Sequence, residues 1–160
     1  MIVAGASYFD PAAKGTPLVW ANNSVTYYTD QGDLSPVLPG PSADALVAAA
    51  FIHWTGIPTV ALGAMEVGHL AEDVNGTNVA LTNGVLSLPA DIQPDAFGTP
   101  VGIVYDQDGQ ITETLLGVGS SADCLNNAAY GGPDNFTTGG NFSHALVILN
   151  GMCVGFHAGR

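Results

Sequence analysis

The chain has 160 residues and a one-sided charge: 14 are Asp or Glu and two are Lys or Arg, a formal net charge of −12. Binding to DNA, RNA or an anionic membrane surface requires cationic side chains, so the composition excludes these partners. Hydrophobic residues make up 47% and charged residues 10% of the chain, which indicates a protein that buries a core. The length is typical of one domain, and we expect residues 1–160 to form a single globular unit.

The composition also indicates an extracellular location. The longest apolar run, Ala45 to Ile52, is much shorter than the ~18 residues that cross a bilayer, so no membrane insertion is expected. Residues 1–5 lack the features of a signal peptide, so we expect a leader to have been removed or the chain to begin within a longer one. The two cysteines, Cys124 and Cys153, have no C-x-x-C spacing, and a disulfide is favoured over two free thiols.

The first predicted element is a strand at Ser24 to Thr29, which is rich in β-branched and aromatic residues. The turn-forming residues Asp30 to Asp33 follow it, and the proline-containing segment Pro36 to Pro41 comes next. Ser42 is then the predicted N-cap of a helix over residues 42–54, which a Gly and a Pro end shortly afterwards.

Beyond this helix, short apolar runs alternate with Gly, Asn and Asp turns, a pattern that predicts strands. The predicted strands are Thr59 to Leu62, Asn78 to Thr82, Val85 to Leu88, Val101 to Tyr105, Gln110 to Leu116 and Ala145 to Leu149. The sequence therefore predicts an α+β, β-rich fold, in which a twisted mixed sheet is backed by one main helix at about residues 42–54.

The segment Asp106 to Glu113 is similar to the middle of a calcium-binding loop. If Gly109 takes the sharp-turn position of an EF-hand, Asp106 and Asp108 fall on ligand positions, but apolar residues occupy the first and last ligand positions, which excludes a true EF-hand. The segment favours a β-hairpin whose turn is Asp108-Gly109. Because a hairpin tip with two carboxylates can still bind a hard cation, we predict Asp106 and Asp108 as metal ligands.

The excess of carboxylates makes calcium the expected cofactor. With almost no basic partners, the acidic side chains must be solvated, mutually repelling or bound to cations, and hard oxygen ligands favour calcium or magnesium. Further candidate ligands, none with a decisive spacing, are Asp30, Asp33, Glu72, Asp73, Asp134 and Asn135.

Other catalytic motifs are missing from the sequence. The four histidines form no H-E-x-x-H or comparable zinc motif, and the glycine-rich nucleotide-binding motifs are absent. A G-x-S-x-G elbow is absent too, so a serine triad would require the fold to bring Ser120 together with His144 and either Asp123 or Asp134. For a metal-dependent hydrolase, the candidate catalytic residues are Glu113, His144 and Asp134.

Three segments, Ser24 to Ser35, Ala50 to Trp54 and Pro100 to Gly109, resemble a group of uncharacterised secreted proteins of soil Acidobacteria. The likeness spans about Tyr8 to Cys153. In those longer proteins this region is similar to the front half of a matrixin-like, metzincin-type domain, in which the catalytic zinc helix comes later. The resemblance implies architecture, secretion and a chain truncated before that helix, and it implies neither a zinc ligand nor peptidase activity.

A looser likeness is to small hydrolases from soil bacteria, including calcium-dependent lactonases that open acyl-homoserine lactones. This likeness has no defined motif and assigns no residue, but its calcium requirement agrees with the acidic composition. A bound calcium ion would polarise a lactone carbonyl or lower the pKa of a water molecule, with a carboxylate as general base.

Two functions remain in competition. The first is a secreted calcium-dependent hydrolase of a small ester or lactone, such as an N-acyl-homoserine lactone. It requires a concave site that holds two or more of Asp106, Asp108, Glu113, Asp134 and His144. The second is a non-catalytic extracellular domain stabilised by calcium, the front half of a degenerate metzincin-like unit that folds, adheres or binds a partner. We take the hydrolase as the working hypothesis because turnover is directly testable.

Overall fold

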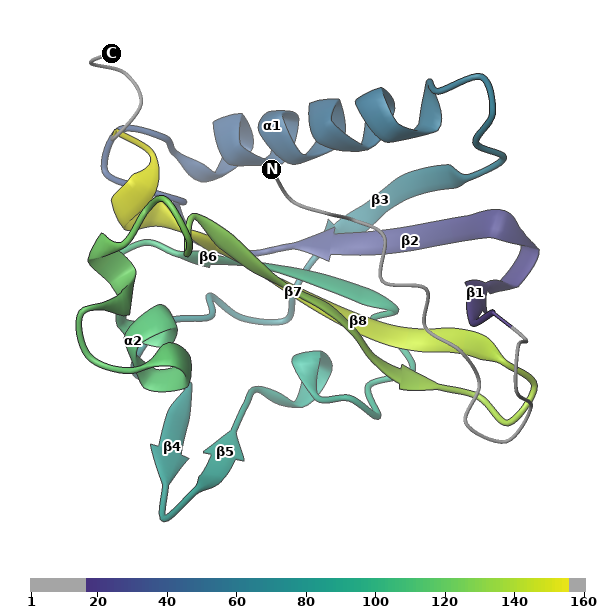
Figure 1. Cartoon of the computed structure of the whole chain (residues 1–160). Coiled ribbons are helices and arrows are strands. Elements are labelled where there is room, and N and C mark those ends of the chain that lie inside the picture. Colours follow the sequence, from purple (N-terminus) through teal and green to yellow (C-terminus); the bar gives the residue numbers. More distant parts are fainter. Residues whose placement is uncertain (1–16, 156–160) are drawn as a thin grey trace.

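The computed structural model describes residues 17–155 and shows a mixed, mostly parallel sheet with one long helix on one face (Figure 1). The prediction of an α+β, β-rich fold with one main helix is confirmed. The expectations about residues 1–5 and about the C-terminal end fall outside the described residues. The elements are β1 (Val19–Trp20), β2 (Ser24–Thr29), α1 (Gly40–Thr55), β3 (Gly63–His69), β4 (Ala80–Thr82), β5 (Val85–Ser87), β6 (Val101–Asp106), α2 (Gln110–Leu116), β7 (Ala129–Phe136) and β8 (Asn141–Asn150), with short 3-10 turns η1 (Ala21–Asn23), η2 (Ala90–Ile92), η3 (Ser120–Ala122) and η4 (Gly151–Cys153).

The strand order of the main sheet is β1-β8-β6-β2-β3. Strand β7 also pairs with β8, along the edge opposite β6. Strands β3, β2, β6 and β8 are parallel, whereas β7 is antiparallel. From β2 the chain crosses through α1 to β3 on one side, and it later returns to β6 on the other side of β2. The direction of strand addition therefore reverses between β2 and β6. In open α/β sheets, ligands commonly bind at the carboxyl ends of the strands at such a reversal.

The central strand β6 has both of its faces covered. All six of its residues are buried, and alternate residues contact opposite layers, as the two-residue period of a strand requires. Ile103 and Tyr105 belong to a core cluster under α1, whereas Val104 belongs to a second cluster on the other face. The first cluster also contains Val25, Tyr27, Leu34, Ala43, Val47, Val101 and Ala145, and the second contains Leu70, Val74, Val79, Ile92, Ile111 and Ile148.

Helix α1 begins two residues earlier than predicted. Pro39 is its N-cap, and the predicted cap, Ser42, lies inside the first turn. The backbone N–H of Gly40 instead donates to the side chain of Asp33, with a distance of 2.8 Å between Gly40 N and Asp33 Oδ1. An acceptor from the preceding loop thus satisfies one of the free N–H groups at the start of the helix.

The predicted hairpin around Asp108-Gly109 is wrong, because residues 110–116 form helix α2. The physical reason is the side chain of Asp106. It accepts hydrogen bonds from the backbone N–H groups of Ile111 (3.0 Å) and Thr112 (2.7 Å) and from the Thr112 hydroxyl (2.6 Å). These bonds satisfy donors of the first helical turn, which a short helix otherwise leaves free.

The strand predictions also need three corrections. Residues 59–62 are not a strand, and the strand beside β2 is β3, which follows directly. Strand β7 was not predicted, since its Gly131, Gly132 and Pro133 are residues that sheets accept mainly at edges. The strands predicted around residues 78–82 and 85–88 are shorter, and they form the separate β4–β5 hairpin, which projects from the rest of the described chain (Figure 1).

The disulfide between Cys124 and Cys153 is present, with their Cα atoms 5.3 Å apart, as predicted. It links the segment after α2 to the turn that follows β8. Among residues 17–155, no helix has the length and apolar character needed to cross a bilayer.

Candidate functional site

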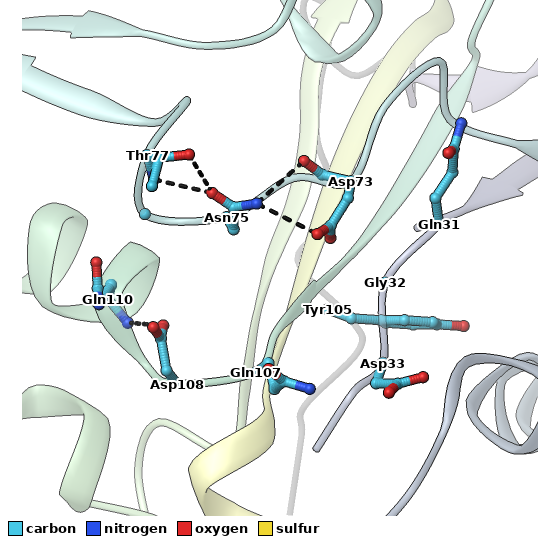
Figure 2. Close-up of a pocket in the computed structure, with 11 residues that line it drawn as sticks. Gln31, Gly32, Asp33, Asp73, Asn75, Thr77, Tyr105, Gln107, Asp108 and Gln110 are labelled. Atoms are coloured by element: carbon cyan, nitrogen blue, oxygen red, sulfur yellow. Dashed lines mark hydrogen bonds between the residues drawn. The ribbon is translucent and has the colours of Figure 1, made fainter. Parts of the chain in front are cut away.

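A polar pocket of about 530 Å³ opens at the carboxyl ends of β2 and β6, beside the loop that follows β3 (Figure 2). Three separate segments form its walls. They contribute Gln31, Gly32 and Asp33 after β2, Asp73, Asn75, Gly76 and Thr77 between β3 and β4, and Tyr105, Gln107, Asp108 and Gln110 from the end of β6 to the start of α2. The pocket thus occupies the crevice at which the strand order reverses.

The chemistry of this pocket is that of carboxylates and amides. Asp33, Asp73 and Asp108 supply three carboxyl groups, and the remaining polar side chains are the amides of Gln and Asn and the hydroxyl of Thr77, while the Tyr105 hydroxyl bonds to Asp44 on α1. None of the described lining residues is Lys, Arg, His, Ser or Cys. The described lining therefore offers many hydrogen-bond acceptors, no cationic side chain and neither a serine nor a cysteine nucleophile.

Hydrogen bonds within the β3–β4 loop order one wall of the pocket. The Asn75 side-chain oxygen accepts from the backbone N–H and the hydroxyl of Thr77, at 2.9 and 2.6 Å (Figure 2). The Asn75 side-chain nitrogen donates to Asp73, at 3.3 Å to Oδ2 and 3.4 Å to the backbone oxygen. This Asx-type arrangement fixes the loop before any ligand arrives.

Asp30 lies beneath the pocket and ties its walls together. Its side chain is 1% exposed and accepts from the backbone N–H groups of Gly32 (3.3 Å), Val74 (3.0 Å) and Tyr105 (2.9 Å). Burial raises the pKa of Asp30 to about 6, although these three hydrogen bonds act in the opposite direction. One carboxyl group therefore connects the ends of β2 and β6 with the β3–β4 loop.

Tyr105 joins the pocket to helix α1. Its hydroxyl donates to Asp44 Oδ1 at 2.7 Å. Burial raises the pKa of the Tyr105 hydroxyl, and the hydrogen bond to Asp44 and the Asp44 charge raise it further. The phenol is therefore a protonated hydrogen-bond donor at neutral pH.

Two glycines allow the walls to approach one another. A Cβ atom on Gly32 would overlap the carboxylate of Asp73, and one on Gly76 would overlap the side chain of Gln110. Glycine at these two positions thus sets the width of the crevice.

The two predicted metal ligands have different environments. Asp108 is exposed and lines the pocket, and its Oδ1 accepts from the backbone N–H of Gln110 at 3.1 Å. Asp106 is fully buried and its two oxygens accept the three hydrogen bonds that cap α2. In the described part of the chain, no three His, Cys, Asp or Glu side chains are grouped in a way that could hold a metal ion. A calcium ion in this pocket would need amide or backbone oxygens as further ligands.

The predicted catalytic residues lie outside the pocket. Glu113 fastens α2 to the following turn, since its Oε1 accepts from the Ser121 hydroxyl (2.7 Å) and the Gly119 N–H (3.3 Å). His144 and Asp134 do meet, with 2.6 Å between His144 Nδ1 and Asp134 Oδ1.

This His144–Asp134 pair lies at the opposite end of the sheet from the pocket. His144 is 1% exposed and precedes Ala145, which pairs with the first residue of β6, whereas Asn150 pairs with the last residue, Asp106. The strand rise separates these two pairs by about 17 Å. Ser120 hydrogen-bonds to the backbone oxygen of Thr112 on α2, so the serine triad is not assembled. Of the five groups named for a concave catalytic site, the pocket contains only Asp108.

Sequence reasoning named Asp33 and Asp73 only as scattered cation ligands, and it did not single out Gln31, Gln107 or Gln110. The available signal was the polar turn after each strand, because parallel strands bring their carboxyl ends to one edge of the sheet. This signal locates the pocket only if β3 is known to be a strand that lies parallel to β2.

No protein-family model, no curated protein and no solved structure matches this chain. The resemblances to matrixin-like proteins and to calcium-dependent lactonases stay predictions, and the function is argued from the pocket.

Proposed function

We propose that this protein binds a small uncharged ligand, rich in hydrogen-bond donors, in the polar pocket at the ends of β2 and β6. The observation that carries this proposal is the convergence of three carboxylates and several amides, from three separate segments, on one cavity. Carboxylates are acceptors for hydroxyl and amide N–H groups. Anionic ligands are disfavoured, because none of the described residues that line the pocket is cationic and the protein has a net charge of −12.

The preformed walls support ligand binding. Asp30 and Asn75 hold the pocket segments through hydrogen bonds that do not depend on a ligand. A site that is ordered beforehand loses less conformational entropy when the ligand binds. The volume of about 530 Å³ is also within the usual range for small-molecule sites.

Hydrolysis of a small ester or lactone is the second candidate function. It is favoured by one observation, that Asp73 and Asp108 line the same cavity from two different walls. One carboxylate would act as general base for an attacking water molecule, while the amide N–H groups of Gln107 or Gln110 would donate to the ester carbonyl. An N-acyl-homoserine lactone would be such a substrate. In this proposal the pocket aspartates take the role that the sequence assigned to Glu113, His144 and Asp134.

Calcium and secretion are parts of the same proposal. The excess of acidic side chains supports a stabilising calcium ion, and the Cys124–Cys153 disulfide supports an oxidising, extracellular compartment. If calcium stabilises the protein and no substrate is turned over, the protein is a non-catalytic extracellular binding domain.

The test combines binding with turnover. We would titrate the protein with methyl β-glucoside and a short-chain N-acyl-homoserine lactone, following backbone NMR shifts, and would assay lactone opening with calcium and with a chelator. The proposal expects shifts in the segments around Asp73 and Gln107, and a loss of binding in the Asp108→Asn variant. The control is Asp123→Asn, at an exposed aspartate outside the pocket. Binding without turnover retires the hydrolase, and the absence of both binding and turnover overturns the whole proposal.

A further inference from the structure

A second cavity lies directly beside the polar pocket. It has a volume of about 340 Å³ and lies between the β2–α1 loop and the turn after β8. Gln107 and Asp108 line both cavities. The two cavities are therefore neighbours on either side of the β6–α2 turn.

The second cavity is apolar where the first is polar. Pro36, Val37 and Met152 form much of its lining. Val37 is 76% and Met152 54% exposed, so large apolar side chains flank the cavity without being covered by the described residues. Besides Gln107 and Asp108, Ser35 is the polar side chain among the described lining residues, and its hydroxyl oxygen accepts from the Val37 and Leu38 N–H groups within its own turn. Such a surface attracts an apolar group rather than a second polar one.

The walls of this apolar cavity are held in place independently of a ligand. Ser35 and Leu38 exchange two backbone hydrogen bonds of 3.2 and 3.1 Å. On the other side, the Met152 N–H donates to the side chain of Asn150 (3.1 Å), and the neighbouring Cys153 is fixed by the disulfide. Gly151 allows these walls to come close, because a Cβ atom there would overlap the backbone oxygen of Leu34.

We propose that the two cavities form one site for an amphiphile, with an uncharged polar head in the first cavity and a short alkyl or acyl chain in the second. The inference rests on the proposed function, since the polar pocket must bind the head. A cavity of about 340 Å³ is at the small end of ligand sites and accommodates a short chain rather than a folded partner. Asp108 stands at the junction, so an amphiphile with an anionic head, such as a fatty acid, is repelled.

The test is a chain-length series on one constant head. We would measure the affinity of methyl, butyl, hexyl and octyl β-glucoside below their micellar concentrations by calorimetry. Burial of each added methylene group is expected to tighten binding roughly fourfold, until the chain fills the cavity and the gain stops. The variants Val37→Asn and Met152→Gln should flatten this dependence and leave the affinity for the methyl ligand unchanged. Val118→Asn is the matched control, because Val118 is 97% exposed and lines neither cavity.

The outcomes separate this inference from the proposed function. If methyl and octyl β-glucoside bind equally well, the alkyl chain does not enter the apolar cavity. The proposal of an amphiphile site is then overturned, while the proposed polar site is not. If longer chains bind more tightly but the Val37 and Met152 variants have no effect, the chain binds elsewhere, and the inference again fails. One such place is an apolar cavity of about 340 Å³ that Trp54 of α1 and Val147 and Leu149 of β8 help to line. If no member of the series binds, both the polar site and its extension are overturned.

Discussion

The side chain of Asp30 accepts a hydrogen bond from the backbone N–H of Tyr105, which is 75 residues further along the chain. Asp30 directly follows β2 and Tyr105 belongs to β6, so this bond extends the contact of the two strands beyond their register of Tyr28 with Gly102 and Thr29 with Ile103. The same carboxyl group also binds Val74 in the β3–β4 loop. The integrity of the pocket therefore depends on a buried ionisable group.

This dependence predicts a pH effect on stability. The pKa of Asp30 is about 6 in the folded protein, against 3.8 for an ordinary aspartate. Between these values the folded state binds a proton that the unfolded state does not, so the contribution of Asp30 to the free energy of unfolding increases as the pH falls from about 6 to about 4. The gain is at most about 3 kcal/mol.

The Asp30→Asn variant isolates this contribution. An amide has one acceptor oxygen where the carboxylate has two, so at least one backbone N–H loses its acceptor, at a cost of about 1–3 kcal/mol. At about pH 7 this cost is offset because neutral Asn avoids the penalty of burying the ionised carboxylate. In urea denaturation, the free energy of unfolding of wild type minus that of the variant should therefore increase as the pH falls from about 7 to about 4. A decrease of this difference on acidification would contradict the raised pKa. Asp95→Asn, at an exposed position, is the control.

A second prediction separates the two roles assigned to Asp106. As the cap of α2, its change to Asn should lower the free energy of unfolding by about 1–3 kcal/mol, equally with calcium and with a chelator. As a calcium ligand, it should matter only when calcium is present. Thermal melting under both conditions distinguishes these roles. Asp108→Asn, at the exposed neighbour that lines the pocket, should change stability by less than about 0.5 kcal/mol.

A third prediction concerns the width of the crevice. In Gly76→Ala the added methyl group displaces the side chain of Gln110 from the pocket wall. The added methyl group would also overlap Gln110 Cβ, which rotation of the side chain cannot move away, so the β3–β4 loop or the start of α2 must shift. We therefore expect the melting temperature to fall and the affinity for the head ligand to fall severalfold. The matched control is Gly68→Ala in β3, where an added Cβ has no neighbour within 4 Å. Equal affinities for the two variants would show that this wall does not contact the ligand.

A fourth prediction concerns the disulfide. Cys124 and Cys153 are 29 residues apart, and closing a loop of this length stabilises the folded state by about 3–4 kcal/mol. Guanidinium denaturation with and without reductant should show this difference. Reduction should also weaken the dependence of affinity on chain length, since Met152 precedes Cys153 in the wall of the apolar cavity. If affinity depends on alkyl chain length equally before and after reduction, the disulfide does not hold that wall in place.

Sequence reasoning predicted the elements whose local pattern agrees with their burial. The alternating strand β2 and the buried strand β6 have this property. Helix α1 was predicted from its helix-forming residues and the residues that end it, since Leu46, Ile52 and Trp54 on it are exposed. Sequence reasoning failed at α2, because the bonds from Asp106 to Ile111 and Thr112 stabilise a helical turn that follows a hairpin-like Asp-Gly pair. It also missed β3, a sheet edge whose residues are mostly exposed and therefore show no hydrophobic alternation.

The candidate site was less predictable than the fold. The acidic residues Asp33, Asp73 and Asp108 were all noticed, but hydrophobic periodicity cannot show that β2 and β6 are neighbours. The close contact of His144 with Asp134 has a similar origin, since it depends on the irregular pairing of β7 with β8. In both cases the decisive information is which strands lie side by side.

The hydrogen bonds of Asp30 also have a consequence for how the sequence of this protein can evolve. They join backbone groups to a single buried carboxyl group, so they place no demand on the identity of the exposed side chains above it. Gln107 and Gln110 are exposed and line the pocket. Substitutions at these two positions are therefore free to alter which ligand is recognised without weakening the scaffold, and a library randomised at both should consist largely of folded proteins with different ligand preferences.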